Sequence, residues 1–218
     1  MAYITLNDVN KTIKKQKVLD GVSLELEPNR IYGFVGKNGS GKTMLFRAIC
    51  GLIRCEGTIL VNGRKIGKDV SSPPGLGLMI ENIGLWPGLT GMQSLSLLAG
   101  LNRKIGKDAV AASIQRVGLD PADKRPFRKY SLGMKQRLVI AQAIMESPEL
   151  LVQDEPTNAL DAEGVLLFRE IIREEKERGA TVLIASHNGE DIQQLCDQIF
   201  FMQSGRLADC RAPEGTEG

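Results

Sequence analysis

The segment 36–43, with the sequence GKNGSGKT, carries residue types that together can hold the phosphates of a nucleotide. Its spacing fits the phosphate-binding pattern G-x-x-x-x-G-K-[ST]. Glycines allow backbone angles closed to other residues, so N–H groups can approach an anion closely. Lys42 can reach the β- and γ-phosphates, and the Thr43 hydroxyl can ligate Mg²⁺. The expected nucleotide contacts are Gly36, Lys37, Asn38, Gly39, Ser40, Gly41, Lys42, Thr43 and Met44.

Hydrolysis of a nucleotide needs a metal ligand and a positioned water in addition to this loop. Asp154 and Glu155 directly follow the apolar run 150–152, and ligands gather at the C-terminal ends of parallel strands. We expect Asp154 to hold Mg²⁺ through water and Glu155 to act as the general base. An isolated pair of this kind more often begins a turn, but the preceding strand and the phosphate loop favour the catalytic interpretation.

His187 is the only histidine, and it follows the apolar run 181–185. A lone histidine is more often a surface or core residue than a catalytic one. Its place at the end of a predicted strand puts it at the same sheet edge as Gly36 and Asp154. From there its Nε2 atom can reach a γ-phosphate or orient a water.

Ser131 and Gly133 open a predicted helix at 131–145, on which Met134, Leu138 and other apolar residues share one face. A helix N-terminus with these residues is a second candidate anion site. An ordinary N-cap is the alternative interpretation. Two phosphate sites on different lobes of one chain are difficult to combine in a monomer.

The remaining pattern indicates which elements position these groups. Alternating segments at 3–9 and 18–27 predict strands of an antiparallel sheet. Apolar strands alternate with helices along the rest of the chain, which predicts a mostly parallel sheet flanked by helices. The further strands are expected at 31–35, 57–61, 76–80, 150–152, 181–185 and 198–203, and the helices at 44–52, 92–101, 108–117, 131–145, 162–178 and 189–196.

The bulk properties are those of a globular protein, with 218 residues, 42% hydrophobic and 25% charged. The net charge of +2 gives no electrostatic case for nucleic acid. We see no signal peptide and no apolar run of about 20 residues, the length that a membrane-spanning helix needs. The four cysteines match no zinc spacing, so we expect free thiols.

Five motifs now support a family resemblance: GKNGSGKT at 36–43, YSLGMKQRL at 130–138, LLVQDEP at 150–156, NALD at 158–161 and ASH at 185–187. With these in order, the chain resembles the ATP-binding subunit of an ATP-binding-cassette transporter from Ile4 to about Leu207. The resemblance implies an α/β fold: a P-loop NTPase core with a mostly parallel sheet, an N-terminal antiparallel β subdomain and an inserted α-helical subdomain. It implies one ATP-binding domain over 1–218, with the helical subdomain at about 84–146 and a polar tail at 211–218.

The resemblance also implies a head-to-tail dimer, a homodimer on the simplest reading, with two ATP molecules and Mg²⁺ between the subunits. Ser131 and Gly133 of one subunit would contact the γ-phosphate held by the other, and Asp161 would link the two sites. Glu155 would be the catalytic base and His187 the γ-phosphate sensor, with Lys42 also in the catalytic group. Hydrolysis would drive an integral membrane permease, which places the subunit on the cytoplasmic face of the membrane.

Several positions depart from the common family pattern. Glu81 stands where most members have glutamine, and it could still meet Mg²⁺ or the water. Ile13 stands where an aromatic residue usually stacks on adenine, and Gln153 replaces an apolar residue. The motifs MIEN at 79–82 and YSLGM at 130–134 resemble the branch that exports bacitracin, lantibiotics and related peptides.

Trp86, the only tryptophan, has two interpretations: a core residue of the helical lobe, or part of a loop that docks the membrane subunit. Two other functions remain open for the chain. One is a soluble cassette ATPase that acts on DNA or ribosomes, against which the absence of long heptad repeats argues. The other is a weakly hydrolysing module paired with a different active subunit, which Ile13, Glu81 and Leu132 keep open.

Overall fold

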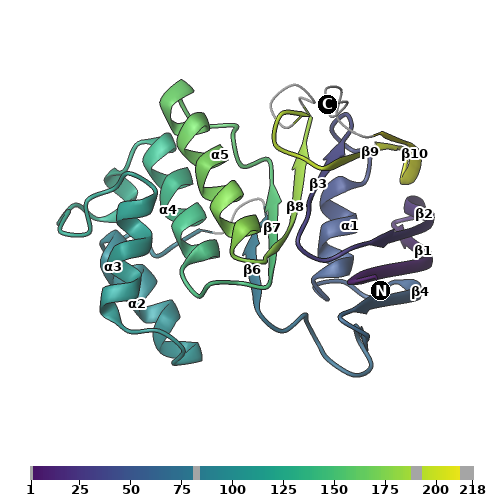
Figure 1. Ribbon diagram of the computed structural model, residues 1–218, viewed down its shortest axis with the longest axis horizontal. Coiled ribbons are helices and arrows are strands. Elements are labelled where there is room, and N and C mark those ends of the chain that lie inside the picture. The colour runs from purple at the N-terminus through teal and green to yellow at the C-terminus, as the bar shows by residue number, and fades with distance from the viewer. Residues whose placement is uncertain (1, 81–83, 188–192, 212–218) are drawn as a thin grey trace.

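The computed structural model describes residues 2–80, 84–187 and 193–211. Within them the chain forms two sheets and a layer of helices, seen side by side in Figure 1. The central sheet has the order β10-β9-β3-β8-β7-β6. Its strands are β3 (Ile31–Val35), β6 (Leu76–Met79), β7 (Leu150–Asp154), β8 (Thr181–Ser186), β9 (Gln198–Gln203) and β10 (Arg206–Arg211). All neighbours in this sheet pair in parallel except β9 and β10, which form a hairpin.

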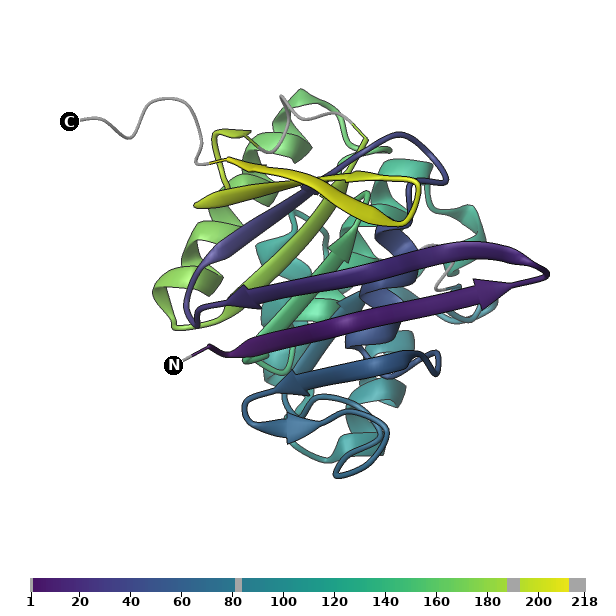
Figure 2. The same cartoon turned by 90° about the vertical axis from the view of Figure 1, so that its right-hand side faces the viewer.

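The second sheet is antiparallel, with the order β2-β1-β4-β5. It consists of β1 (Ile4–Ile13), β2 (Gln16–Leu26), β4 (Glu56–Val61) and β5 (Arg64–Lys65). Figure 2 shows the long β1–β2 hairpin beside the β9–β10 hairpin. The two hairpins are joined where the Asp20 N–H donates to the Gly205 carbonyl at 2.9 Å. The sequence pattern predicted this sheet but ended its first strand too early, because pairing with β2, and with β4 as far as Asn10, extends β1 through the polar residues 10–12.

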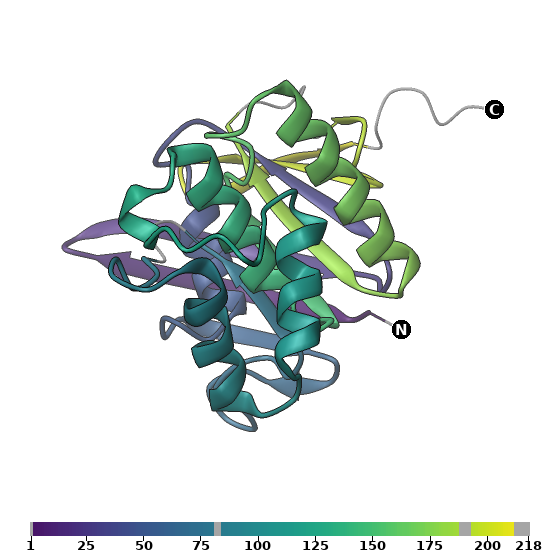
Figure 3. The same ribbon diagram turned by 90° about the vertical axis from the view of Figure 1, so that its left-hand side faces the viewer.

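Helix α1 (Lys42–Ile49) lies between the two sheets, and the other helices cover the opposite face of the central sheet. Figure 3 looks onto these outer helices. They are α2 (Gly91–Asn102), α3 (Lys107–Arg116), α4 (Leu132–Ile144) and α5 (Ala162–Glu177), with a short 3₁₀ helix at Phe127–Lys129. Strands β7 and β8 are buried at every residue because both of their faces are covered. This burial explains why they read in the sequence as short apolar runs and not as alternating ones.

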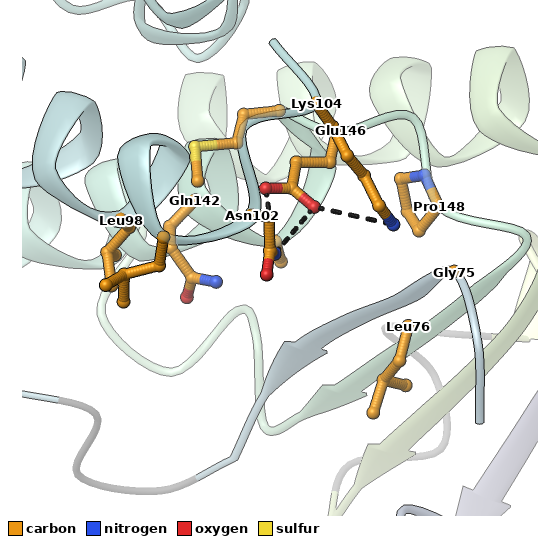
Figure 4. A pocket seen from close by; sticks show the side chains of 11 residues that line it. Gly75, Leu76, Leu98, Asn102, Lys104, Gln142, Glu146 and Pro148 are labelled. Atoms are coloured by element: carbon orange, nitrogen blue, oxygen red, sulfur yellow. Dashed lines mark hydrogen bonds and ion pairs between the residues drawn. The ribbon is translucent and has the colours of Figure 1, made fainter. Parts of the chain in front are cut away.

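Helices α2, α3 and α4 are inserted between β6 and β7 and pack on the central sheet through one apolar cluster, to which polar contacts are added. The Arg116 guanidinium on α3 pairs with Glu174 at 2.7 Å and with Glu175 at 2.8 Å, both on α5. Figure 4 shows the other end of the insertion, where Glu146, just beyond α4, accepts hydrogen bonds of 3.0 Å from Asn102 of α2. The same carboxylate lies 3.9 Å from Lys104.

Trp86 is 42% exposed, so the interpretation of this residue as part of the core is wrong. The neighbouring residue Leu85, and not Trp86, is buried, with 4% exposure. The described cysteines are free, as expected, and burial raises the pKa of the Cys50 and Cys196 thiols to about 12. No helix in the described part of the chain combines the length and apolarity that crossing a membrane requires.

The expected helix at 189–196 and the tail at 211–218 lie largely outside the described residues, as does Glu81. Within the described part, the predicted hairpin turn at Ser204 and Gly205 is confirmed, with φ values of 49° and 79°. Both values are left-handed, as a two-residue turn of this hand requires. The hairpin therefore places its turn next to β2, where it also meets the phosphate loop described below.

Candidate active site

The glycine segment connects the end of β3 to the start of α1, as the sequence predicts. Gly41 is the N-cap of α1, with φ 110° and no side-chain cap, so its conformation is one that glycine tolerates best. The first intrahelical bond runs from the Leu45 N–H to the Gly41 carbonyl at 2.8 Å. The N–H groups of the first turn therefore have no partner from the helix itself, and with the helix dipole they favour an anion.

This phosphate loop is packed tightly against its surroundings. A Cβ atom on Gly36 would lie 2.4 Å from the Met202 carbonyl oxygen, a distance that excludes any side chain there. The Gly205 N–H in the β9–β10 turn donates to the Ser40 carbonyl at 2.8 Å. The β9–β10 hairpin thus holds the phosphate loop through this hydrogen bond. In front of it lies a cavity of about 300 Å³ that Gln16 and Val18 line together with 38–44 and Glu155.

Lys42 extends from the start of α1 back across the loop. Its Nζ donates to the Gly36 carbonyl at 2.6 Å and lies 3.6 Å from Glu155 Oε1. The side chains of Lys42 and Glu155 are only 6% and 11% exposed. A cation held in so little solvent attracts phosphate oxygens more strongly than a surface lysine does.

Two of the three expected metal ligands, Thr43 and Asp154, lie together, and the third, Glu81, lies outside the described residues. Thr43 Oγ1 donates to Asp154 Oδ2 at 2.6 Å, and Asp154 is the last residue of β7, with 2% exposure. Hydroxyl and carboxylate oxygens suit Mg²⁺, which keeps waters and is completed by substrate phosphates. No group of three or more acidic, cysteine or histidine side chains in the described ranges could hold a metal by itself. The donor set of Thr43 and Asp154 fits Mg²⁺.

Glu155 and His187 form a hydrogen-bonded pair, with Nδ1 2.8 Å from Oε2. Glu155 lies just beyond β7, and His187 lies just beyond β8. The adjacent parallel strands end side by side, so His187 lies at the same sheet edge as Asp154, as the sequence predicts, and its side chain meets that of Glu155. The carboxylate orients the imidazole, so its other nitrogen, Nε2, is the atom suited to a phosphate or a water.

The Glu155 backbone has φ 51°, a left-handed conformation that is uncommon for a residue with a side chain. Its N–H donates to the Ala185 carbonyl at 2.9 Å. The Gln136 side-chain amide on α4 donates to the Glu155 carbonyl at 3.3 Å and to the Pro156 carbonyl at 2.8 Å. Gln136 is a contact of the site that sequence reasoning missed, because nothing in the helical pattern shows that its amide reaches another element.

Ser131 is the N-cap of α4 and accepts a hydrogen bond from the Met134 N–H at 3.2 Å. Ser131 therefore caps α4, as the alternative interpretation of this residue expected. Gly133 faces the backbone carbonyl of Ala159, and a Cβ atom on Gly133 would lie 3.0 Å from that oxygen. Ser131 and Gly133 line a cavity of about 510 Å³ that also contains Asp161. This cavity shares no lining residue with the phosphate-loop cavity, so one chain does not bring the two predicted phosphate sites together.

Asp161 has a local role that the motif did not indicate. It is the N-cap of α5, accepting a hydrogen bond from the Gly164 N–H at 2.9 Å, and it pairs with Arg137 at 3.0 Å. These contacts, the Gly164 N–H first, lower the pKa of the Asp161 carboxyl. Ile13, at the end of β1, is 38% exposed and pairs with Gln16, so the described hairpin presents no aromatic ring to the cavity.

Comparison with known proteins shows the family to which the chain belongs. The family model described as "ABC transporter" matches residues 19–158. The chain is 47% identical over 205 residues to YybJ of Bacillus subtilis (strain 168), described as an uncharacterized ABC transporter ATP-binding protein, with 94% of each chain covered. It is 36% identical to the bacitracin transport ATP-binding protein BcrA of Bacillus licheniformis, over 94% of this chain and 68% of that one.

Another relative is the lantibiotic transport ATP-binding protein SrtF of Streptococcus pyogenes, 32% identical over 98% of this chain and 93% of its own length. Among solved structures, a dimeric post-hydrolysis state of the ATP-binding cassette MJ0796, bound to ADP and Pi, matches with a TM-score of 0.88. The match covers 97% of this chain and 99% of that one at 21% identity, and it shows the same fold.

Proposed function

Since this chain belongs to the ABC transporter family, as an ATP-binding subunit with ATPase activity, we propose which of its residues bind and hydrolyse ATP. The phosphate loop 36–44 holds the phosphates through backbone N–H groups, and Lys42 binds the β- and γ-phosphates. Thr43 and Asp154 hold Mg²⁺, for which their 2.6 Å contact is the supporting observation. Glu81, which lies outside the described residues, is a further candidate ligand.

Magnesium supplies charge neutralisation on the phosphates when it is bound. The chemistry of the protein lies in Glu155, whose carboxylate takes a proton from the attacking water. His187 holds that carboxylate through the 2.8 Å contact and contacts the γ-phosphate with Nε2. Lys42 neutralises charge on the phosphates and lies 3.6 Å from the same carboxylate. The chain of contacts from Lys42 through Glu155 to His187 is the observation that carries this assignment.

The second cavity supports a head-to-tail dimer of this chain. Ser131 and Gly133 line it, far enough from the phosphate loop that the two cavities share no residue. Leu132 between them is 71% exposed, so its side chain is available to a partner subunit. In a head-to-tail pair, Ser131 and Gly133 complete the γ-phosphate site of the other subunit, and Asp161 lies between the two sites.

We also propose an integral membrane permease as the partner. Trp86 is 42% exposed, and it is held beside the 3₁₀ helix 127–129, where the Arg128 N–H donates to the Pro87 carbonyl at 3.0 Å. An exposed tryptophan on a supported loop is a typical anchor of a protein interface. Because BcrA and SrtF are named for bacitracin and lantibiotic transport, a peptide antibiotic is the substrate class that we propose, and export its direction. Docking to the permease would place the chain on the cytoplasmic face of the membrane.

The test of the site is the variant Glu155→Gln, with Glu170→Gln on the exposed face of α5 as the matched control. We expect Glu155→Gln to keep MgATP binding, to lose at least about 100-fold in kcat, since a general base contributes roughly 10²–10⁴-fold, and to run as an ATP-dependent dimer on size exclusion. Glu170→Gln should match the wild-type protein in all three measurements. Wild-type turnover by Glu155→Gln would refute the assignment of the base.

The rival function is a cassette ATPase that is not coupled to transport. A pull-down of the tagged chain from detergent-solubilised native membranes separates the two functions. A stoichiometric multi-span membrane protein supports the permease proposal. Recovery of ribosomal or DNA-bound proteins alone would support the rival and leave the ATPase assignment intact.

A further inference from the structure

The side chain of Gln136 connects the inserted helices to the core at the catalytic segment. Gln136 lies in the second turn of α4, and its Nε2 atom donates to the carbonyls of Glu155 and Pro156, at 3.3 and 2.8 Å. Both acceptors are main-chain atoms in the turn that follows β7. The contact therefore acts on the backbone that carries the catalytic carboxylate and leaves the carboxylate itself free for Lys42 and His187.

That backbone needs support. Glu155 has φ 51°, and a left-handed conformation at a residue other than glycine costs of order 1–3 kcal/mol. Such a conformation persists only where the surroundings determine it. On one side the Glu155 N–H is bound to the Ala185 carbonyl of β8 at 2.9 Å. On the other side the Gln136 amide donates to both carbonyls, and the Glu155 carbonyl also accepts a longer hydrogen bond of 3.5 Å from the Asn158 N–H.

We propose that Gln136 is a positioning residue for hydrolysis, which holds the Glu155 backbone in its left-handed conformation and so aims the carboxylate at the attacking water. The proposal rests on the assignment of Glu155 as the general base. Gln136 does not line the phosphate-loop cavity but lines, with Asp154 and Glu155, another cavity of about 450 Å³ that shares Glu155 with it. In this proposal Gln136 acts through Glu155 and not through the nucleotide.

The same contact links two sites within one chain. Ser131 and Gly133 lie at the N-terminus of α4, and Gln136 lies one turn further along the same helix. A ligand that moves the N-terminus of α4 also moves the amide that holds Glu155.

The test compares Gln136→Met, which keeps the length of the side chain and removes the donor, with Gln136→Lys, which restores a nitrogen donor. The matched control is Gln142→Met on the same helix, because Gln142 lines the cavity of Figure 4 at the far end of α4 from Glu155. MgATP affinity, the number of binding sites per chain, kcat and KM are measured for each variant. Counting binding sites removes any contribution from misfolded protein.

We expect Gln136→Met to lower kcat per binding site at least tenfold, with Kd and KM within about threefold of the wild-type values, and Gln136→Lys to recover part of the loss. Gln142→Met should keep the wild-type kcat. In the Glu155→Gln background, Gln136→Met should cause no further loss, because the two residues act as one unit.

Wild-type kcat in Gln136→Met, an equal loss in Gln142→Met, or a full additional loss in the Glu155→Gln background would each overturn the proposal. These results leave the function of Glu155 untouched, provided that Glu155→Gln alone is inactive. Wild-type turnover by Glu155→Gln would instead overturn both proposals.

Discussion

The Lys42 ammonium and the Glu155 carboxylate face each other at the phosphate-loop cavity, with Nζ 3.6 Å from Oε1. One cation thus lies against both the carbonyl of Gly36 and the proposed base. The pair joins the start of α1 to the end of β7, so the binding of phosphate and the positioning of the base depend on the same side chain.

Lys42→Met should therefore damage binding more than Glu155→Gln does. It removes the phosphate contact and leaves a carboxylate in the cavity that repels the triphosphate. We expect the Kd for MgATP to rise at least tenfold, which is about 1.4 kcal/mol, as measured by isothermal titration calorimetry. Lys68→Met, at an exposed position outside the site, should leave the Kd unchanged. Equal affinities of Lys42→Met and the wild-type protein would remove Lys42 from the phosphate site.

Ile13→Tyr should tighten the binding of ATP. Ile13 ends β1 and pairs with Gln16, which lines the cavity, so a ring at position 13 can stack on the base. Stacking of one base on an aromatic ring contributes about 1–3 kcal/mol, or roughly 5- to 150-fold in affinity. Calorimetry with ATP and with inorganic triphosphate separates base from phosphate contacts. A gain with ATP alone supports stacking, whereas an equal gain with triphosphate contradicts it.

Gln153→Leu should stabilise the protein. Gln153 is 0% exposed in β7, and its amide atoms make no hydrogen bond within the described part of the chain. A buried polar group without a partner costs about 1–3 kcal/mol, so an apolar residue of similar size should raise the free energy of unfolding by about that amount. Urea denaturation measures the change. Gln203→Leu, at an exposed position of β9, is the control, and a loss of stability in Gln153→Leu would mean that the amide is bonded in solution.

Glu174 and Glu175 offer a comparison between an exposed and a buried ion pair. Both contact Arg116, but their side chains are 59% and 2% exposed, and Glu175 also binds Arg178 at 2.6 Å. Glu175→Gln should lower the free energy of unfolding by about 2 kcal/mol, less than the 3–5 of a dry pair because both guanidinium groups reach solvent. Glu174→Gln should cost about 0.5 kcal/mol or less. Equal losses in urea denaturation would show that burial does not decide the strength of this link between α3 and α5.

Trp86→Ala should weaken assembly with the permease while leaving MgATP binding intact, because the exposed ring lies outside the phosphate-loop cavity. Co-purification from solubilised membranes measures assembly. The control is Leu166→Ala on α5, which removes an apolar side chain that is 59% exposed. Normal recovery of the permease with Trp86→Ala would remove this residue from the docking surface.

The sequence predicts those parts of the molecule in which a functional motif and the hydrophobic pattern of the surrounding residues require the same structure. Strand, glycine turn and helix at 31–49 are confirmed, because the spacing of glycines and the apolar run both require them. Asp154, Glu155 and His187 meet because parallel strands end at the same sheet edge, and the glycine loop after β3 brings Thr43 of α1 to that edge.

The rest depends on contacts between segments far apart in the chain. The extension of β1 to Ile13 comes from pairing with other strands and not from its own polar residues. The exposure of Trp86 could not be decided from one residue type that occurs both in cores and at interfaces. The hydrogen bonds of Gln136 to the carbonyls of Glu155 and Pro156 could not be predicted, since nothing in the sequence distinguishes this glutamine from the other glutamine on α4.

The left-handed backbone of Glu155 and the amide of Gln153, which has no hydrogen-bond partner among the described residues, lie on either side of Asp154, and both oppose stability. Selection of random variants for heat resistance alone should therefore favour glycine or asparagine at position 155 and apolar residues at 153. The first of these changes would abolish turnover, whereas the second removes no atom that we assign to the reaction. A comparison of evolved lineages, with and without a requirement for activity, would thus separate the instability that catalysis demands from the instability that it merely tolerates.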